Sequence, residues 1–259
     1  MFEAFLLLPL LLIIATSIIF GTLGTCVLWH RLTYFGDALA HAMLLAIAIS
    51  LSFDCHYVLA TLILVVFFVL MFFYLSSYSA FNKDNLLAIV TYTAVALAIV
   101  IRDLGGNIDF NHYFFGEIFA VTKKDIYLVL FCALFVLIYV RLYFKKLLIL
   151  QISRELSQVN RIASNHLYLV FLFILAINVA ILLEFIGIFL TTALLIMPAS
   201  IARCYAKTPS SMIIIATLVS LLVSLISFAL SVNFDLTLAA VNVAALSVVF
   251  FCSLRFLKL

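Results

Sequence analysis

Long apolar stretches, separated by short polar breaks, follow one another from the first residues of the chain to the last. Most stretches hold about 17 to 25 residues and almost no charge. A helix needs about 20 apolar residues to cross the hydrocarbon core of a bilayer, because it rises about 1.5 Å per residue. Only a helix satisfies its backbone within one such stretch, so the pattern predicts an all-α, polytopic membrane bundle.

The positions of the polar breaks predict about nine transmembrane helices. Eight or ten also fit, because the runs near 102–123 and 184–203 are hard to divide. No soluble domain or linker interrupts the series, so we expect a single transmembrane domain over 1–259. The predicted spans are about 4–28, 35–53, 57–75, 84–101, 125–144, 167–183, 186–203, 210–231 and 236–256.

Local signals mark two helix starts and one kink. Thr122 and Asp125 have the spacing of a capping box, and Thr208 precedes a proline at a first helical position. Pro198 lies inside a predicted span and removes the backbone hydrogen bond to Leu194. We therefore expect a kink at Pro198.

Composition places the chain in a membrane. Hydrophobic residues make up 68% of it and charged residues 10%, whereas soluble domains have roughly 45–50% and about 25%. The five cysteines form no CxxC pair, and we expect them to pack as small apolar side chains. No Lys or Arg precedes Arg31, so the first stretch lacks the basic start of a signal peptide and should remain as a spanning helix.

The distribution of basic residues predicts the orientation, because cytoplasmic loops are enriched in Lys and Arg. With the N-terminus outside and the C-terminus inside, eleven basic residues lie on the cytoplasmic side and three outside. The eleven are Arg31, Lys83, Arg141, Lys145, Lys146, Arg154, Arg161, Arg203, Lys207, Arg255 and Lys258. The three are Arg102, Lys123 and Lys124.

Two ionisable residues stand out inside the second predicted span. Asp37 and His41, in "YFGDALAHA", are four residues apart and therefore share one helix face. If that helix begins near Thr33, they lie about 6 Å and about 12 Å along it. Ionisable groups inside a bilayer are costly and persist mainly where they function.

A carboxylate oxygen and an imidazole nitrogen are two ligands for zinc or manganese. Because a closed zinc site has four ligands, two would hold an ion loosely enough for transport. A homodimer with its axis beside this helix would bring two such pairs together. Two alternatives stay open: Asp37 and His41 as a structural hydrogen-bonded pair, or as a proton relay.

Weaker candidates lie at the predicted outer face. His56 in "FDCHY" and His112 in "IDFNHYFFGEIF" are surrounded by aromatic and acidic residues. Such mixtures are typical of an interfacial aromatic belt, although acidic loops also attract cations. We keep His56 and His112 as secondary candidates for contact with the ion.

The longest predicted cytoplasmic loop, about 145–166, contains a short amphipathic helix. Leu156 and Val159 belong to its apolar face, while Arg154, Glu155 and Arg161 lie elsewhere on its surface. Such a helix either rests on the membrane surface or docks a cytoplasmic partner. The pattern alone does not choose between these functions.

Several function classes lack their motifs. The sequence contains no GxxxxGK[ST] loop, no HExxH, no GxSxG and no paired-cysteine zinc motif. We therefore do not expect the chain to be an enzyme, to bind ATP through a P-loop, or to hold a permanent cofactor. Nothing in it indicates a nucleic-acid partner.

Three segments resemble the metal-uptake branch of ABC transporter permeases, and most closely its zinc-uptake permeases. They are "CVLWHRLTYFGDALAHAMLLAIAIS" (26–50), "NHYFFGEIFAVTKKD" (111–125) and "FIGIFLTTALLIMPASIARCYAKTP" (185–209). The match runs in register over nearly the whole chain. Its most specific parts are the DxxxHA and LLIxPA segments.

The resemblance implies a homodimeric permease of the bacterial cytoplasmic membrane that imports a divalent metal, zinc before manganese or iron. It implies two cytoplasmic ATP-binding subunits and an extracytoplasmic metal-binding protein as partners, besides the lipid bilayer. Asp37 and His41 would line the ion path, and 151–165 would be the helix coupled to the ATPase. The alternative is a proton-coupled secondary transporter with the same pair as relay.

The chain departs from zinc permeases at two places. Ala239-Ala240 replaces a Gly-Pro pair, and Tyr92 stands near a position where histidine tends to occur. The second departure leaves the selectivity between zinc and manganese open.

Overall fold

The computed structural model describes residues 2–53, 55–76, 82–105, 111–152 and 164–255. Within these residues the chain forms helices and no strand, which confirms the all-α prediction. The elements are α1 (Phe2–Trp29), α2 (Thr33–Ser52), α3 (Tyr57–Leu75), α4 (Lys83–Gly105), α5 (Asn111–Phe115), the 3₁₀ turn η1 (Ile118–Ala120), α6 (Lys123–Ile152), α8 (Ser164–Tyr205), α9 (Pro209–Phe234) and α10 (Leu238–Leu254).

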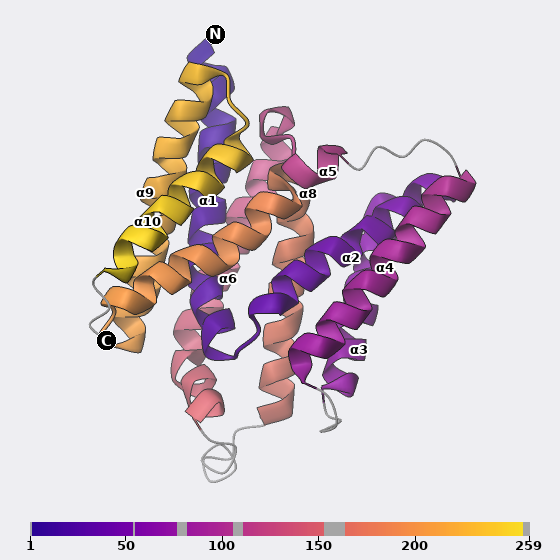
Figure 1. The fold of residues 1–259 in the computed structure, drawn as a ribbon, viewed down its shortest axis with the longest axis horizontal. Coiled ribbons are helices and arrows are strands. Elements are labelled where there is room, and N and C mark those ends of the chain that lie inside the picture. Colours follow the sequence, from indigo (N-terminus) through magenta and orange to yellow (C-terminus); the bar gives the residue numbers. More distant parts are fainter. Residues whose placement is uncertain (1, 54, 77–81, 106–110, 153–163, 256–259) are drawn as a thin grey trace.

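Among the described residues, seven helices are long and apolar enough to cross a membrane, and α10 is a shorter apolar helix. One of the seven, α8, has 42 residues and changes direction at Gly187, as Figure 1 shows near the label α5. Its two arms correspond to the predicted spans 167–183 and 186–203. Counting the arms separately and including α10 recovers the nine predicted segments.

The sharp bend in α8 has its origin in glycine geometry. Gly187 has φ 76° and ψ 167°, a backbone conformation that side chains with a Cβ rarely adopt. A Cβ there would also lie 2.5 Å from the carbonyl oxygen of Phe114. Helical backbone angles are lost at Gly187, close to the predicted break between the two spans, and Pro198 lies inside the second arm, where the predicted kink stays a prediction.

Both predicted caps are present. Thr208 and Ser211 form a reciprocal capping box, with the Ser211 N–H donating to Thr208 Oγ1 at 3.2 Å and the Thr208 N–H donating to Ser211 Oγ at 3.1 Å. At the start of α6, the backbone N–H and the hydroxyl of Thr122 donate to Asp125 Oδ2 at 2.9 and 2.7 Å. These bonds satisfy donors that a helix start leaves open.

The core lies around α1, α2 and α8. In the most apolar stretch of each helix, 67% of the residues are buried in α2 and in α8, but only 22% are buried in α3 and in α4. Helix α1 packs against α6, α8 and α9, whereas α2 packs against α3, α4 and α8. Figure 1 shows α2, α3 and α4 grouped on one side of the molecule. Helix α4 therefore covers α2 with one face and leaves the other exposed.

The cysteines carry no cross-link. All five lie among the described residues and are free thiols. Cys26 is buried, Cys132 and Cys204 are partly buried, and Cys55 and Cys252 are exposed. The two exposed thiols differ from the prediction that the cysteines pack as small apolar side chains.

Candidate metal-binding cavity

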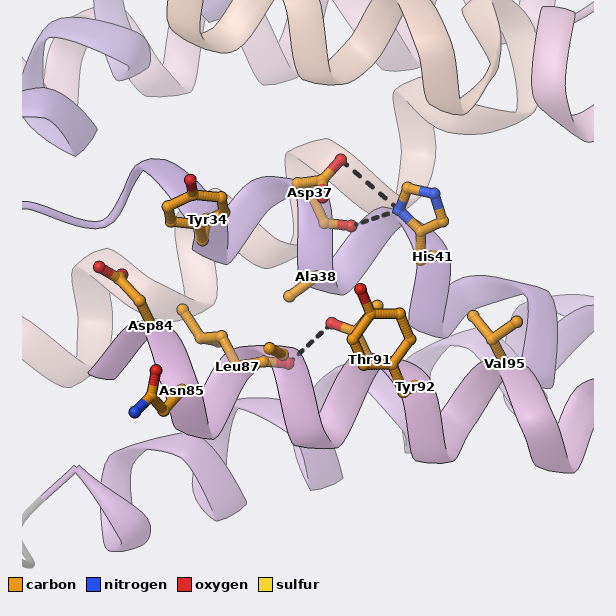
Figure 2. A pocket seen from close by; sticks show the side chains of 11 residues that line it. Tyr34, Asp37, Ala38, His41, Asp84, Asn85, Leu87, Thr91, Tyr92 and Val95 are labelled. Carbon is orange, nitrogen blue, oxygen red and sulfur yellow. Dashed lines mark hydrogen bonds and ion pairs between the residues drawn. The ribbon is translucent and has the colours of Figure 1, made fainter. Parts of the chain in front are cut away.

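A cavity of about 520 Å³ lies between α2 and α4, and both Asp37 and His41 line it (Figure 2). The two helices run side by side in this view and supply the whole lining. The lining residues are Tyr34, Asp37, Ala38, His41, Asp84, Asn85, Leu87, Ala88, Thr91, Tyr92 and Val95.

The backbone of α2 orients the imidazole of His41. Its Nδ1 lies 2.9 Å from the carbonyl oxygen of Asp37 and 3.5 Å from Asp37 Oδ1. A carbonyl oxygen can only accept, so Nδ1 carries the hydrogen and donates it. The neutral ring then has its free lone pair on Nε2. An Nδ1–H bond to a backbone carbonyl is a usual support for a metal-ligating histidine.

The side chains of His41 and Asp37 are 30% and 42% exposed. A structural pair packed between helices would be shielded on all sides, whereas this one opens into the cavity. Among the described residues, no three His, Cys, Asp or Glu side chains gather closely enough to hold a metal ion. One chain therefore brings two candidate ligands together at this place, Asp37 and His41, and α4 adds side chains with oxygen atoms to the same cavity.

Helix α4 contributes a polar stripe that the sequence analysis missed. Asp84, Thr91 and Tyr92 recur at helical spacing and form one cavity wall with the apolar residues Ala88 and Val95. Figure 2 shows Asp84 near Tyr34 at one end, while Tyr92 lies farther along α4, toward His41. The spacing of these polar residues was a usable signal, but it did not tell which helix they face.

Two of these side chains differ in what they can offer an ion. The Thr91 hydroxyl donates to the carbonyl oxygen of Leu87 at 2.8 Å, which fixes its rotamer. Tyr92 is 75% exposed. It stands near the position where the resemblance led us to expect histidine, and it does line the cavity.

The secondary candidates lie elsewhere. His56 is an exposed residue just before α3 and does not line the cavity. His112 belongs to α5, but its side chain lies outside the described residues. The predicted docking residues Arg154, Glu155, Leu156, Val159 and Arg161 also lie outside the described residues.

Comparison with known proteins identifies the family of the chain. A model of the ABC 3 transport family matches residues 2–257. The chain belongs to the ABC 3 transport family. Its sequence is 32% identical over 238 residues to the high-affinity zinc uptake system membrane protein ZnuB of Haemophilus influenzae, covering 91% of this chain and 90% of the relative. It is 26% identical to the manganese transport system membrane protein MntC of Halalkalibacterium halodurans, covering 92% and 82%.

The fold agrees with this family. The structure of PsaBC from Streptococcus pneumoniae in complex with Fab superposes with a TM-score of 0.83 at 23% identity, covering 96% of this chain and 90% of that one. The family, the apolar helices and the relatives together identify a multi-pass protein of the inner membrane that serves transport.

Proposed function

We propose that this member of the ABC 3 transport family is the membrane-spanning subunit of an ATP-driven importer, with zinc as its cargo. The observation that carries the proposal is the cavity between α2 and α4, where the carboxylate of Asp37 and the Nε2 lone pair of His41 are both accessible. Zinc is favoured over manganese because the zinc relative is 32% identical and the manganese relative 26%.

The ligand pair suits a transported ion. Imidazole nitrogen and carboxylate oxygen bind zinc at about 2.0–2.2 Å, and two such ligands leave the other positions to water or to a second site. Asp84 lines the same cavity at the start of α4 and adds a negative charge there. An ion leaving Asp37 and His41 would thus remain in an acidic cavity as it moves toward that end.

Exposed surface beside the cavity supports a homodimer as the working unit. The outer face of α4 carries exposed large side chains, among them Ile89, Tyr92 and Val100. Among the described residues, only α2 and α4 contribute to the lining of the cavity. A second copy packed there would close the cavity and bring two Asp37–His41 pairs together.

In this proposal, partner subunits and not this chain supply the energy for transport. The sequence has no P-loop of its own, so ATP would be bound and hydrolysed by two cytoplasmic subunits. The segment at about 145–166, with Arg154 and Arg161, is proposed to dock on them. A separate extracytoplasmic protein would deliver the metal. Membership in an ABC family favours this scheme over proton coupling.

The proposed orientation places the N-terminus outside. Figure 1 shows the two termini at opposite ends of the bundle, as an odd number of crossings requires. The turn between α1 and α2, which contains Arg31, lies at the end away from the N-terminus. An excess of basic residues at that end fits a cytoplasmic location.

The first test is radioactive zinc uptake in a bacterium that lacks its own zinc importer and expresses this chain with its ATPase and binding protein. We expect Asp37→Asn and His41→Ala each to lower uptake by roughly 10-fold or more, because each removes one of two strong ligands. Both variants should still assemble with the ATPase at wild-type membrane levels. Normal uptake by both would show that the pair is a structural hydrogen bond.

A further inference from the structure

Tyr168, in the first turns of α8, contacts side chains from three other parts of the molecule. Lys83 Nζ donates to the Tyr168 hydroxyl at 3.4 Å and lies 5.3 Å from the ring centroid. The rings of His30 and Phe73 lie 6.1 and 6.4 Å from the Tyr168 ring, measured between centroids. Tyr168 is thus a junction of aromatic and cation–π contacts.

The three partners belong to the elements that build and support the metal cavity. Lys83 is the first residue of α4 and directly precedes Asp84, which lines the cavity. His30 lies in the turn that leads into α2, and Phe73 lies near the end of α3. Helix α4 packs mainly on α2, and the side chain of Lys83 reaches from its start to α8.

His30 is buried among aromatic rings beside Tyr168. It is 8% exposed, its ring centroid lies 5.2 Å from that of Phe171, and its Nε2 has no hydrogen-bond partner among the described residues. Burial, and then the charge of Lys83, lower the pKa of His30 to about 4. The imidazole is therefore neutral at physiological pH and does not repel Lys83.

From these contacts we infer that Tyr168 is a positioning residue that links the start of α8 to α4, and through α4 to the cavity of Asp37 and His41. The inference rests on the proposed function, in which the segment that precedes α8 in the chain docks on the ATPase. A displacement of the first turn of α8 moves Tyr168. Lys83 follows Tyr168, and the lining residues of α4 then shift relative to Asp37 and His41.

The contact has the properties that such a link requires. The face of an aromatic ring attracts a cation over a range of positions, so Lys83 can follow Tyr168 through a small displacement. Helix α4 and the first arm of α8, from Ser164 to the bend at Gly187, are continuous helices, and a shift at one end is carried along each of them. Coupling through packed side chains is established only by measuring it, so the test must separate transport from ATP hydrolysis.

The experiment uses the complex with its ATPase subunits and binding protein, reconstituted in lipid vesicles, with zinc uptake and ATP hydrolysis measured on the same samples. We expect Tyr168→Ala and Lys83→Met to lower the zinc transported per ATP by about 5-fold or more, a typical size for lost coupling. Zinc-free ATP hydrolysis and assembly should stay near wild type. Tyr168→Phe keeps the ring and should retain most of the transport.

Arg102→Gln is the matched control. The Arg102 guanidinium donates to Asp103 Oδ1 at 2.9 Å, and both residues belong to α4. This ion pair lies within one helix, so its loss does not disconnect two helices and transport per ATP should not change.

Two results would overturn the inference. One is an unchanged ratio of zinc to ATP in both Tyr168→Ala and Lys83→Met. The other is a parallel loss of transport and hydrolysis that Tyr168→Phe shares, which marks a purely structural role. Asp37→Asn in the same vesicles tests the proposed metal site independently, since Asp37 makes none of the Tyr168 contacts.

Discussion

At the scale of single residues, the site depends on how one histidine is held. The carbonyl oxygen of Asp37 accepts the Nδ1 hydrogen of His41, so the nitrogen left for an ion is Nε2. The i, i+4 spacing in the sequence predicted that Asp37 and His41 share a face, because helical periodicity is local. It did not predict the tautomer, which depends on an atom of the backbone.

Asp84 provides a prediction at this scale. Its carboxylate is exposed and lines the cavity, so it lowers the electrostatic potential met by a cation there. We expect Asp84→Asn to reduce zinc uptake at subsaturating zinc by roughly 3-fold at low salt, and by less at high salt, because ions screen exposed charges. Uptake should be measured across a salt series.

The control for Asp84→Asn is Asp103→Asn on the same helix. Asp103 is also exposed but pairs with Arg102 at 2.9 Å and does not line the cavity. Its removal should leave uptake unchanged. Equal effects of the two substitutions would mean that Asp84 acts through the net charge of the protein and not through the cavity.

At the scale of elements, the bend of α8 is fixed by a contact between two glycines. Gly116 and Gly187 have φ values of 72° and 76°, and a Cβ on either would meet the backbone of the other segment. The segment between α5 and η1, which contains Gly116, therefore lies directly against the bend of α8. Neither residue can be replaced without moving backbone.

Gly187→Ala should destabilise the protein by about 2–3 kcal/mol, because it combines a strained backbone conformation with a steric clash. In detergent this should lower the melting temperature by roughly 5 °C or more. Gly36→Ala is the comparison: its Cβ would meet the end of the Leu195 side chain and no backbone atom, so we expect a smaller loss. A larger loss in Gly36→Ala would show that the bend is not a rigid contact.

The same scale shows what sequence patterns can and cannot predict. The caps at Thr122 and Thr208 and the division of α8 into two arms follow from local signals, and the structure contains them. The exact position of the bend, at Gly187, could not be predicted, since a close approach of distant backbone decides it. The pairing of α2 with α4 could not be predicted either, because the apolar residues on a helix face do not specify which helix packs against them.

At the scale of the whole molecule, one chain leaves the cavity open along α4. In the most apolar stretch of α3, and also in that of α4, only 22% of the residues are buried. Tyr92, which lines the cavity, is 75% exposed. Lipid would cover an apolar face of this kind, but it would not complete an acidic cavity. A second copy would do both, so the proposed dimer axis runs along the exposed side of α4.

This arrangement predicts a specific cross-link. In a background with Cys55 and Cys252 replaced by serine, Tyr92→Cys should form a covalent dimer in membranes treated with a short bismaleimide, because the two copies of residue 92 face each other across the axis. Tyr127→Cys is equally accessible, at 72% exposure, but lies on α6. It should remain monomeric. A dimer from Tyr127→Cys with none from Tyr92→Cys would move the axis away from the cavity, and each Asp37–His41 pair would then bind its ion alone.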